Sequence, residues 1–132
     1  MPWEIAFYAS GEHFHPSQIA YDFSEAHDPG PRGPQGRHKY GLAIIEVPTS
    51  IPNEDRIRYL VNLVLPLMPD IVKAGATDCQ LDIARYYSTQ CHEELSAEEL
   101  ALIARLQCTL CYTAYQMSEE EELEMKAKLE NY

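Results

Sequence analysis

The stretch "EELSAEELALI" (residues 93–103) carries two independent signals for the start of a helix. Ser96 stands at the expected N-cap, and Glu99, three residues later, completes a capping box. Leu95 before the cap and Leu100 after it occupy the two positions of a hydrophobic staple. We therefore expect the chain to enter a helix here from an extended segment.

A second staple follows the first apolar segment, in "SGEHFHPSQI" (residues 10–19). Pro16 fits the first helical position, because its fixed φ suits a helix and its missing N–H costs nothing there. Phe14 and Ile19 then form the staple. Both stapled segments lie between strand-like segments, so the chain is predicted to consist of two similar strand–helix–strand halves.

A long helix over residues 53–74 is expected to join the halves. Asn53 is its predicted N-cap, and the acidic residues that follow complement the positive end of the helix dipole. Pro66 lacks the N–H that would bond back to Asn62, which predicts a kink near this point. Its buried stripe is predicted to comprise Ile57, Leu60, Val61, Val64 and Met68.

Four segments alternate apolar and polar residues with the period of a half-buried strand. The predicted fold is α+β: one domain over residues 1–132, with a two-layer, four-stranded sheet and helices mainly on one face. Residues 26–39 hold three prolines and three glycines and are expected to form a loop, and residues 117–132 an acidic C-terminal helix. The expected strands are 3–10, 40–47, 78–87 and 108–115, and the expected helices are 16–24, 53–74, 97–106 and 118–130.

The segments "ASGEHFHPSQI" and "CQLDIARYYSTQCHEELSAEELALIARLQCTLCYTAY" resemble the bacterial family of domain of unknown function 4279, over roughly residues 3–116. The shared features are Ser-Gly-Glu, a proline before the first helix, a Leu-Ser helix start and a closing tyrosine. This resemblance implies an α+β fold of two similar halves, and no agreed activity or catalytic residues. The sequence departs from the family in its Pro/Gly-rich loop, which lacks the usual tryptophan.

The net charge of −11 is concentrated in the second half of the chain. Residues 1–66 carry 5 basic and 8 acidic side chains (net −3), and residues 67–132 carry 5 and 13 (net −8). A negative field repels phosphate backbones, so a basic protein is a better partner than nucleic acid. The alternative is that acidity only maintains solubility. No signal peptide or membrane span is recognisable, which predicts a cytoplasmic protein with reduced thiols.

Candidate catalytic and metal-ligating residues lack the patterns that their chemistry requires. His13 and His15, with His27 and His38, could offer imidazoles to a metal, but no carboxylate or thiol completes a site by spacing. Cys108 and Cys111 should point to opposite strand faces, which prevents shared ligation. The adjacent pair Cys91-His92 should also point apart. We expect no metal, no cofactor and no enzymatic activity.

Two surfaces are candidates for binding. If the helices cover one sheet face, the other stays open and carries tyrosines, small residues and acids, a composition that suits a protein interface. The alternative is that the C-terminal helix or a second copy of the chain covers this face. The residues predicted to bind a partner there are Tyr8, Asp82, Tyr86, Thr113 and Tyr115. The second surface is the loop at 26–39, whose expected contacts with an anion or a partner are Arg32, Arg37, His38 and Lys39. The alternative is that this segment is a solvated, mobile loop.

The function hypothesis is a protein-binding module, most concretely an immunity-type inhibitor that neutralises a basic bacterial toxin domain. An alternative hypothesis is a small-molecule sensor or enzyme with a pocket near residues 26–39. A third is a structural protein that self-assembles, which includes a homodimer.

Overall fold

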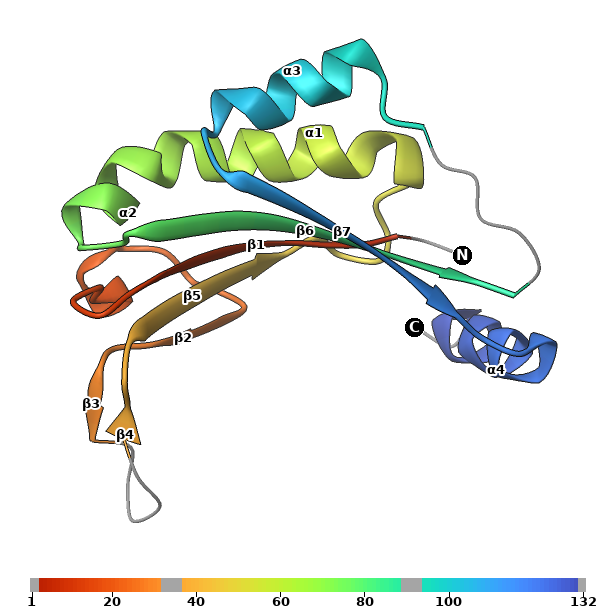
Figure 1. Cartoon of the computed structure of the whole chain (residues 1–132), viewed down its shortest axis with the longest axis horizontal. Helices are drawn as coiled ribbons and strands as arrows, with labels where there is room; N and C mark the ends of the chain where they lie inside the picture. The colour runs from red at the N-terminus through yellow and green to blue at the C-terminus, as the bar shows by residue number, and fades with distance from the viewer. Residues whose placement is uncertain (1–2, 32–36, 89–93, 131–132) are drawn as a thin grey trace.

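The computed structural model describes residues 3–31, 37–88 and 94–130, which form an α+β fold around one mixed sheet (Figure 1). The strands of this sheet run in the order β2-β5-β1-β6-β7. Their bounds are β1 Glu4–Gly11, β2 Glu25–His27, β5 Gly41–Glu46, β6 Asp78–Tyr87 and β7 Thr109–Gln116. Two short strands, β3 (Gly30–Pro31) and β4 (Arg37–His38), pair as a separate ribbon.

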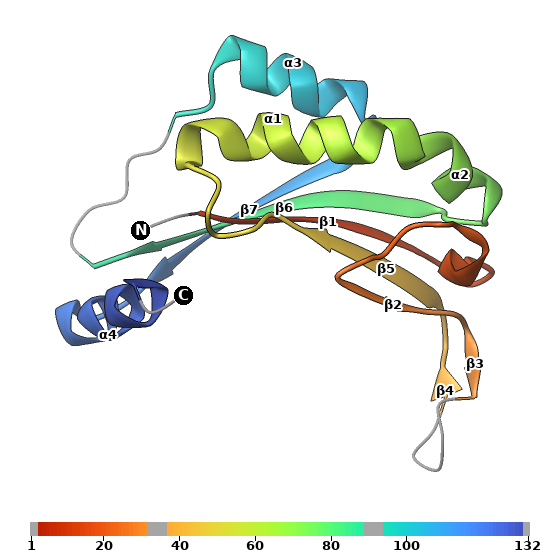
Figure 2. The same ribbon diagram turned by 180° about the vertical axis from the view of Figure 1, so that it is seen from behind.

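The topology explains why helices cover only one face of the sheet. β1 is antiparallel to both of its neighbours, β5 and β6, and β6 is parallel to β7. Strands β5, β6 and β7 therefore run in one direction, and both crossovers between them advance the same way across the sheet. Right-handed crossovers that advance the same way place their helices on the same face. The helices α1 (Asn53–Val64), α2 (Met68–Lys73) and α3 (Ala97–Arg105) all lie on that side (Figures 1 and 2).

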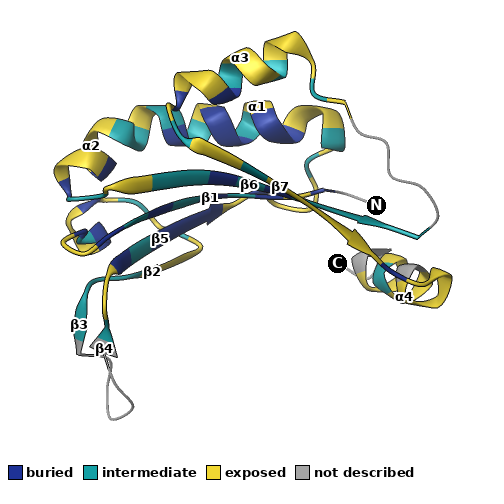
Figure 3. Cartoon of the chain, viewed as in Figure 1, coloured by how far each residue is buried: buried dark blue, intermediate teal, exposed yellow. Residues whose placement is uncertain are grey.

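The core lies between the sheet and α1. The alternation predicted for the first strand is present, because Ile5, Phe7 and Ala9 are buried while the residues between them are more exposed. The predicted helix stripe is buried except for Met68, which is partly exposed; its fully buried members are Ile57, Leu60, Val61 and Val64. Figure 3 shows this buried side of α1 facing the sheet.

The long helix is interrupted where the proline predicted a kink. α1 ends at Val64, a 3-10 turn occupies Leu65–Leu67 around Pro66, and α2 continues from Met68. The predicted N-cap is wrong, however, because Pro52 occupies the cap and Asn53 is the first helical residue. Asn53 instead accepts a hydrogen bond from the backbone N–H of Trp3 at 2.9 Å, which ties the start of β1 to α1.

The capping box that opens α3 is confirmed. Ser96 Oγ accepts from the N–H of Glu99, and the Glu99 carboxylate accepts from the N–H of Ser96, both at 3.0 Å. Leu95 packs against the core, whereas Leu100 is 47% exposed and does not complete a buried staple. An ion pair between Arg58 and Glu98 links α1 to α3.

Three predictions about the first half of the chain are wrong. The helix expected over 16–24 is a single 3-10 turn, Pro16–Gln18. The main sheet has five strands rather than four, because β2, which overlaps the start of the expected loop, pairs with β5. The same loop also contributes the β3–β4 ribbon. The halves also differ in topology: β1 and β5 are antiparallel, whereas β6 and β7 are parallel.

The C-terminal helix α4 (Glu119–Glu130) agrees with the predicted 118–130. Ser118 accepts from the N–H of Glu121 at 3.1 Å and caps its first turn. The helix follows β7 at one end of the sheet (Figures 1 and 2). No helix in the described part of the chain is long and apolar enough to span a bilayer.

Candidate functional site

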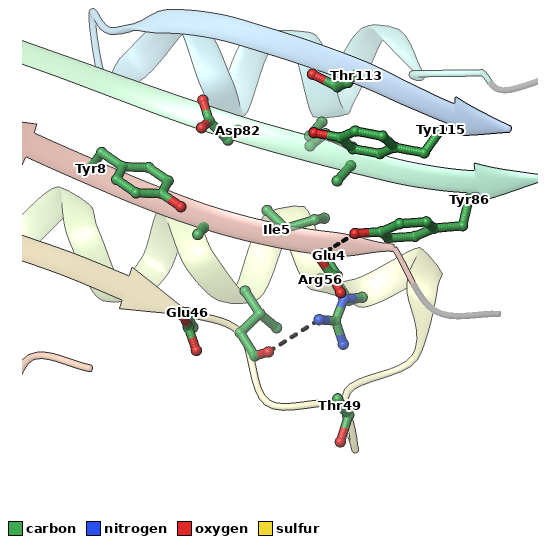
Figure 4. Close-up of a pocket in the computed structure, with 14 residues that line it drawn as sticks. Glu4, Ile5, Tyr8, Glu46, Thr49, Arg56, Asp82, Tyr86, Thr113 and Tyr115 are labelled. Carbon is green, nitrogen blue, oxygen red and sulfur yellow. Dashed lines mark hydrogen bonds between the residues drawn. The ribbon is translucent and has the colours of Figure 1, made fainter. Parts of the chain in front are cut away.

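The sheet face opposite α1, α2 and α3, which we call the outer face, carries a hollow of about 420 Å³. All five residues predicted to bind a partner line it: Tyr8, Asp82, Tyr86, Thr113 and Tyr115. They come from β1, β6 and β7, and Figure 4 shows them on one side of the sheet. No α4 residue is among the described residues that line it. The period-two pattern therefore predicted which side chains the fold brings together here.

Strand register explains why this face is hollow. Ala6 lies opposite Glu46 on one side and Asp82 on the other. Ala84 likewise lies between Glu4 and Thr113. Paired residues of adjacent strands share a face, so each alanine forms a low point between longer side chains. Two methyl groups thus form part of the floor, and the tyrosines and carboxylates rise around them.

Carboxylates surround the phenol of Tyr8. Burial raises the pKa of Tyr8, and the carboxylates of Asp82 and Glu46 raise it further, followed by those of Glu25 and Glu4. A phenol that resists ionisation for these reasons marks a site of negative potential in a partly desolvated setting. A cationic group from a partner would be attracted to the same place.

Two tyrosines form one end of the hollow (Figure 4). The rings of Tyr86 and Tyr115 stack with centroids 5.2 Å apart and an angle of 19° between their planes. The Tyr86 hydroxyl donates a hydrogen bond to Glu4 Oε2 at 3.1 Å. Burial and this bond raise the pKa of Tyr86. The pair presents aromatic surface beside a carboxylate, a combination that can accommodate a guanidinium or ammonium group.

Sequence reasoning missed two groups at the hollow, Glu46 and Arg56. Arg56 is only 2% exposed, and its guanidinium donates to three carbonyls of the β5–α1 connection: Pro48 at 2.8 Å, Ile51 at 3.0 Å and Val47 at 3.1 Å. Its Nε is buried without a hydrogen-bond partner, and burial lowers the pKa of the side chain while Glu4 opposes that shift. Arg56 therefore fixes the loop that bounds the hollow.

Only two residues of the predicted loop site, His38 and Lys39, have described side chains. Arg32 lies outside the described residues, and Arg37 is described only as backbone of β4. Lys39 is exposed, and His38 stacks on His27 with ring centroids 3.4 Å apart. His38 and His27 line a second, wider hollow of about 920 Å³ that also includes Tyr21 and Asp28.

The histidines form no metal site among the residues that the structure describes, where no group of three potential ligands comes together. His13 is exposed, and the Nδ1 atom of His15 lies 3.8 Å from a carboxylate oxygen of Asp28. The rings of His27 and His38 are inclined by only 10°, so they present faces rather than nitrogen lone pairs to one another.

Cys108 and Cys111 lie on opposite faces of the sheet, as predicted. Cys108 packs against the core, whereas Cys111 lies opposite Asp82 on the outer face. Burial raises the pKa of Cys108 and of Cys79, and the two thiols are close enough to influence each other. Thiols with raised pKa values are poor nucleophiles at neutral pH. The Cys91-His92 pair lies outside the described residues.

The chain was compared with protein-family models, with curated proteins and with solved structures, and none of the three comparisons finds a match.

Proposed function

We propose that this chain is a protein-binding module whose outer face receives a basic partner. The observation that carries the proposal is the hollow itself, which collects tyrosines and carboxylates from β1, β5, β6 and β7 on the outer face of the sheet. Tyrosine is enriched in protein interfaces because its ring offers a large apolar area and its hydroxyl a polar handle.

Charge favours a cationic partner over other classes. Glu4, Glu46 and Asp82 line the hollow, and Arg56, the basic residue among its lining, is occupied with backbone carbonyls. A protein with a net charge of −11 also attracts a basic partner at long range and accelerates its association. The same field disfavours nucleic acid.

The most concrete form of this proposal is an immunity-type inhibitor that binds and neutralises a basic toxin domain in the bacterial cytoplasm, without enzymatic activity of its own. The acidic charge of the chain and its tyrosine-bearing outer face support this form. Membership of the family of domain of unknown function 4279 stays a prediction.

The second hollow favours an alternative proposal, a small-molecule sensor or enzyme. Its lining combines aromatic and polar groups, including Tyr21, Asp28 and the stacked pair His27–His38. A small metabolite that copurifies with the native protein but not with the variant His27→Ala would favour this alternative.

Affinity capture with three forms of the chain tests the main proposal. The bait is the native protein, the variant Asp82→Lys with Tyr86→Ala, or the control Asp70→Lys with Val72→Ala. Asp70 and Val72 are exposed on α2, on the helix side of the sheet, and the control changes the net charge by the same amount. A basic protein that binds the native chain and the control but not the outer-face variant would support the proposal.

A second variant distinguishes loss of binding from a folding defect. Thr113→Lys places a positive charge in the hollow from an exposed position, so it should leave the fold intact and still weaken capture of the basic partner. Co-expression of the captured protein with the native chain should restore growth if that protein is a toxin. Capture that is unaffected by either outer-face variant would contradict the proposal.

A further inference from the structure

Ala6 of β1 is part of the floor of the hollow and is surrounded by longer side chains (Figure 4). The strand register places it directly between Glu46 of β5 and Asp82 of β6. Glu4 and Tyr8 lie two residues away along β1, so alternation puts them on the same face as Ala6. Three carboxylates and one phenol, contributed by three strands, therefore enclose the space above this methyl group.

The three carboxylates keep acceptor atoms for a ligand. Asp82 accepts a hydrogen bond from Gln80 through Oδ1 at 2.6 Å, and Glu4 accepts one from Tyr86 through Oε2. None of the three carboxylates forms an ion pair in the described part of the chain. Arg56, the basic residue of the lining, donates to backbone carbonyls instead. The hollow therefore has an excess of negative charge and oxygen atoms that can accept from a cation.

The spacing of these carboxylates favours a wide, planar cation. Glu46 and Asp82 belong to the strands on either side of β1, roughly 10 Å apart at their backbones. Asp82 and Glu4 are diagonal neighbours on paired strands, about 7–8 Å apart. A guanidinium carries five donors in one plane and can bridge two carboxylates, whereas an ammonium group is a compact point charge. No three potential ligands among the described residues come together to hold a metal ion.

Apolar and aromatic surface adjoins the carboxylates. Ala84 of β6 continues the floor, and it lies between Glu4 and Thr113. Tyr86 follows two residues later on the same face, and its ring stacks on that of Tyr115, which is 48% exposed. A guanidinium stacks on aromatic rings and is more weakly hydrated than an ammonium group, so it loses less on entering a partly desolvated hollow.

We propose that the hollow holds one arginine side chain of the basic partner, with the guanidinium above Ala6 among the three carboxylates and the methylene chain along Ala84 toward the tyrosine pair. This inference rests on the proposed function and names the group that the outer face recognises. The net charge of −11 attracts a basic protein from a distance, and the inserted arginine then fixes where that protein docks. Arginine is also among the residues that most often dominate the binding energy of protein interfaces.

NMR titration of the full chain with two capped pentapeptides tests the proposal. The peptides are identical except for a central arginine or lysine, so their equal charge removes long-range attraction as a cause of any difference. We expect the arginine peptide to bind at least about threefold more tightly than the lysine peptide. Its largest effects on the backbone amide signals should fall on Ala6, Ala84 and their neighbours.

Two pairs of matched variants locate the site. Glu46→Gln should weaken binding of the arginine peptide by about threefold or more, whereas Asp70→Asn removes an exposed carboxylate of α2 and should leave it unchanged. Ala6→Leu fills the floor without changing any charge and should abolish the preference for arginine. Thr109→Leu places a leucine at an exposed position of the outer face outside the lining and should preserve that preference. If circular dichroism shows that Ala6→Leu is unfolded, the Glu46→Gln pair decides.

Three results would overturn the arginine site: equal affinity for the two peptides, no amide shift with the arginine peptide at millimolar concentration, or an arginine preference that persists in the folded variants. Failure of the proposed function looks different, because affinity capture of a basic protein would then survive the outer-face variants. If those variants abolish capture while the two peptides bind equally, the arginine site is refuted and the outer face remains the binding surface.

Discussion

Tyr86 and Glu4, 82 positions apart in the chain, are joined by a hydrogen bond of 3.1 Å between the phenol and the carboxylate. Tyr86→Phe should remove this bond and keep the ring stack with Tyr115. Since the bond is exposed to solvent, we expect a loss of less than about 1 kcal/mol in the free energy of unfolding, measured by urea denaturation. Tyr86→Ala should cost more, because it also removes the ring stack. Equal losses for the two variants would show that the stack contributes nothing.

The raised pKa of Tyr8 predicts how stability depends on alkaline pH. The folded state favours the neutral phenol, so its contribution is complete below the unfolded pKa of about 10 and is lost as pH rises through the folded pKa. The native chain should therefore lose stability above about pH 10 more steeply than Tyr8→Phe. Asp82→Asn should weaken this dependence, because it removes the carboxylate that raises the pKa of Tyr8 most. Identical urea midpoints for the native chain and Tyr8→Phe across this range would contradict the prediction.

Phe14, rather than the histidines beside it, should matter for stability. Phe14 is fully buried, and Phe14→Ala should cost about 3–5 kcal/mol of unfolding free energy. His13 is exposed and His15 only half-buried, so an alanine at either position should cost less than about 1 kcal/mol. Thermal unfolding of the three variants gives the ranking. Greater damage from a histidine substitution would point to a role that the structure does not show.

Gly41 should not tolerate a side chain. A Cβ atom at this position would lie 1.7 Å from the carbonyl oxygen of Phe14. An alanine therefore fits here only if the backbone moves. Gly41→Ala should therefore destabilise the fold by more than about 2 kcal/mol, as overpacking against rigid atoms does. Gly30→Ala gives a comparison, since nothing lies near its Cβ position and only its positive φ opposes the change. Chemical denaturation of both variants should show the larger loss for Gly41.

Arg56 should be required for the β5–α1 connection. Arg56→Met removes the donors to three backbone carbonyls and should cost roughly 3 kcal/mol, because buried acceptors are left unsatisfied. Arg56→Lys should recover part of this loss, since an ammonium group can reach some of the carbonyls but lacks the planar fork. Urea denaturation measures both. A Met variant as stable as the native chain would show that water replaces the guanidinium.

The sequence pattern predicted the elements that local chemistry specifies. Four strands lie within about two residues of their expected bounds, and the helix breaks at Pro66, because alternation, capping and proline sterics act over a few neighbouring residues. The sequence did not predict β2, because three residues are too few to show the period of a strand. This strand exists only through its pairing with β5. Parallel and antiparallel strands share the same period of two. The sequence pattern therefore could not predict that one half pairs its strands antiparallel and the other half parallel.

The sequence likewise predicted only part of the candidate site. Alternation placed the tyrosines and Asp82 on one face, but Glu46 joins them only through its register with Ala6. Arg56 lies in a charged helix start, "NEDRIR", which reads as solvent-exposed. Only the path of the preceding loop brings carbonyls to its guanidinium.

Because helices cover only one face of the sheet, selection acts differently on the inward and the outward residues of its strands. Inward residues of β1 and β6 hold the core together, and most changes there would cost stability. The outward residues between them lie on the face opposite α2 and α3, and surface substitutions usually change the free energy of unfolding by less than about 0.5 kcal/mol. Selection could thus redesign what the hollow recognises, strand by strand, while the scaffold beneath it stays the same.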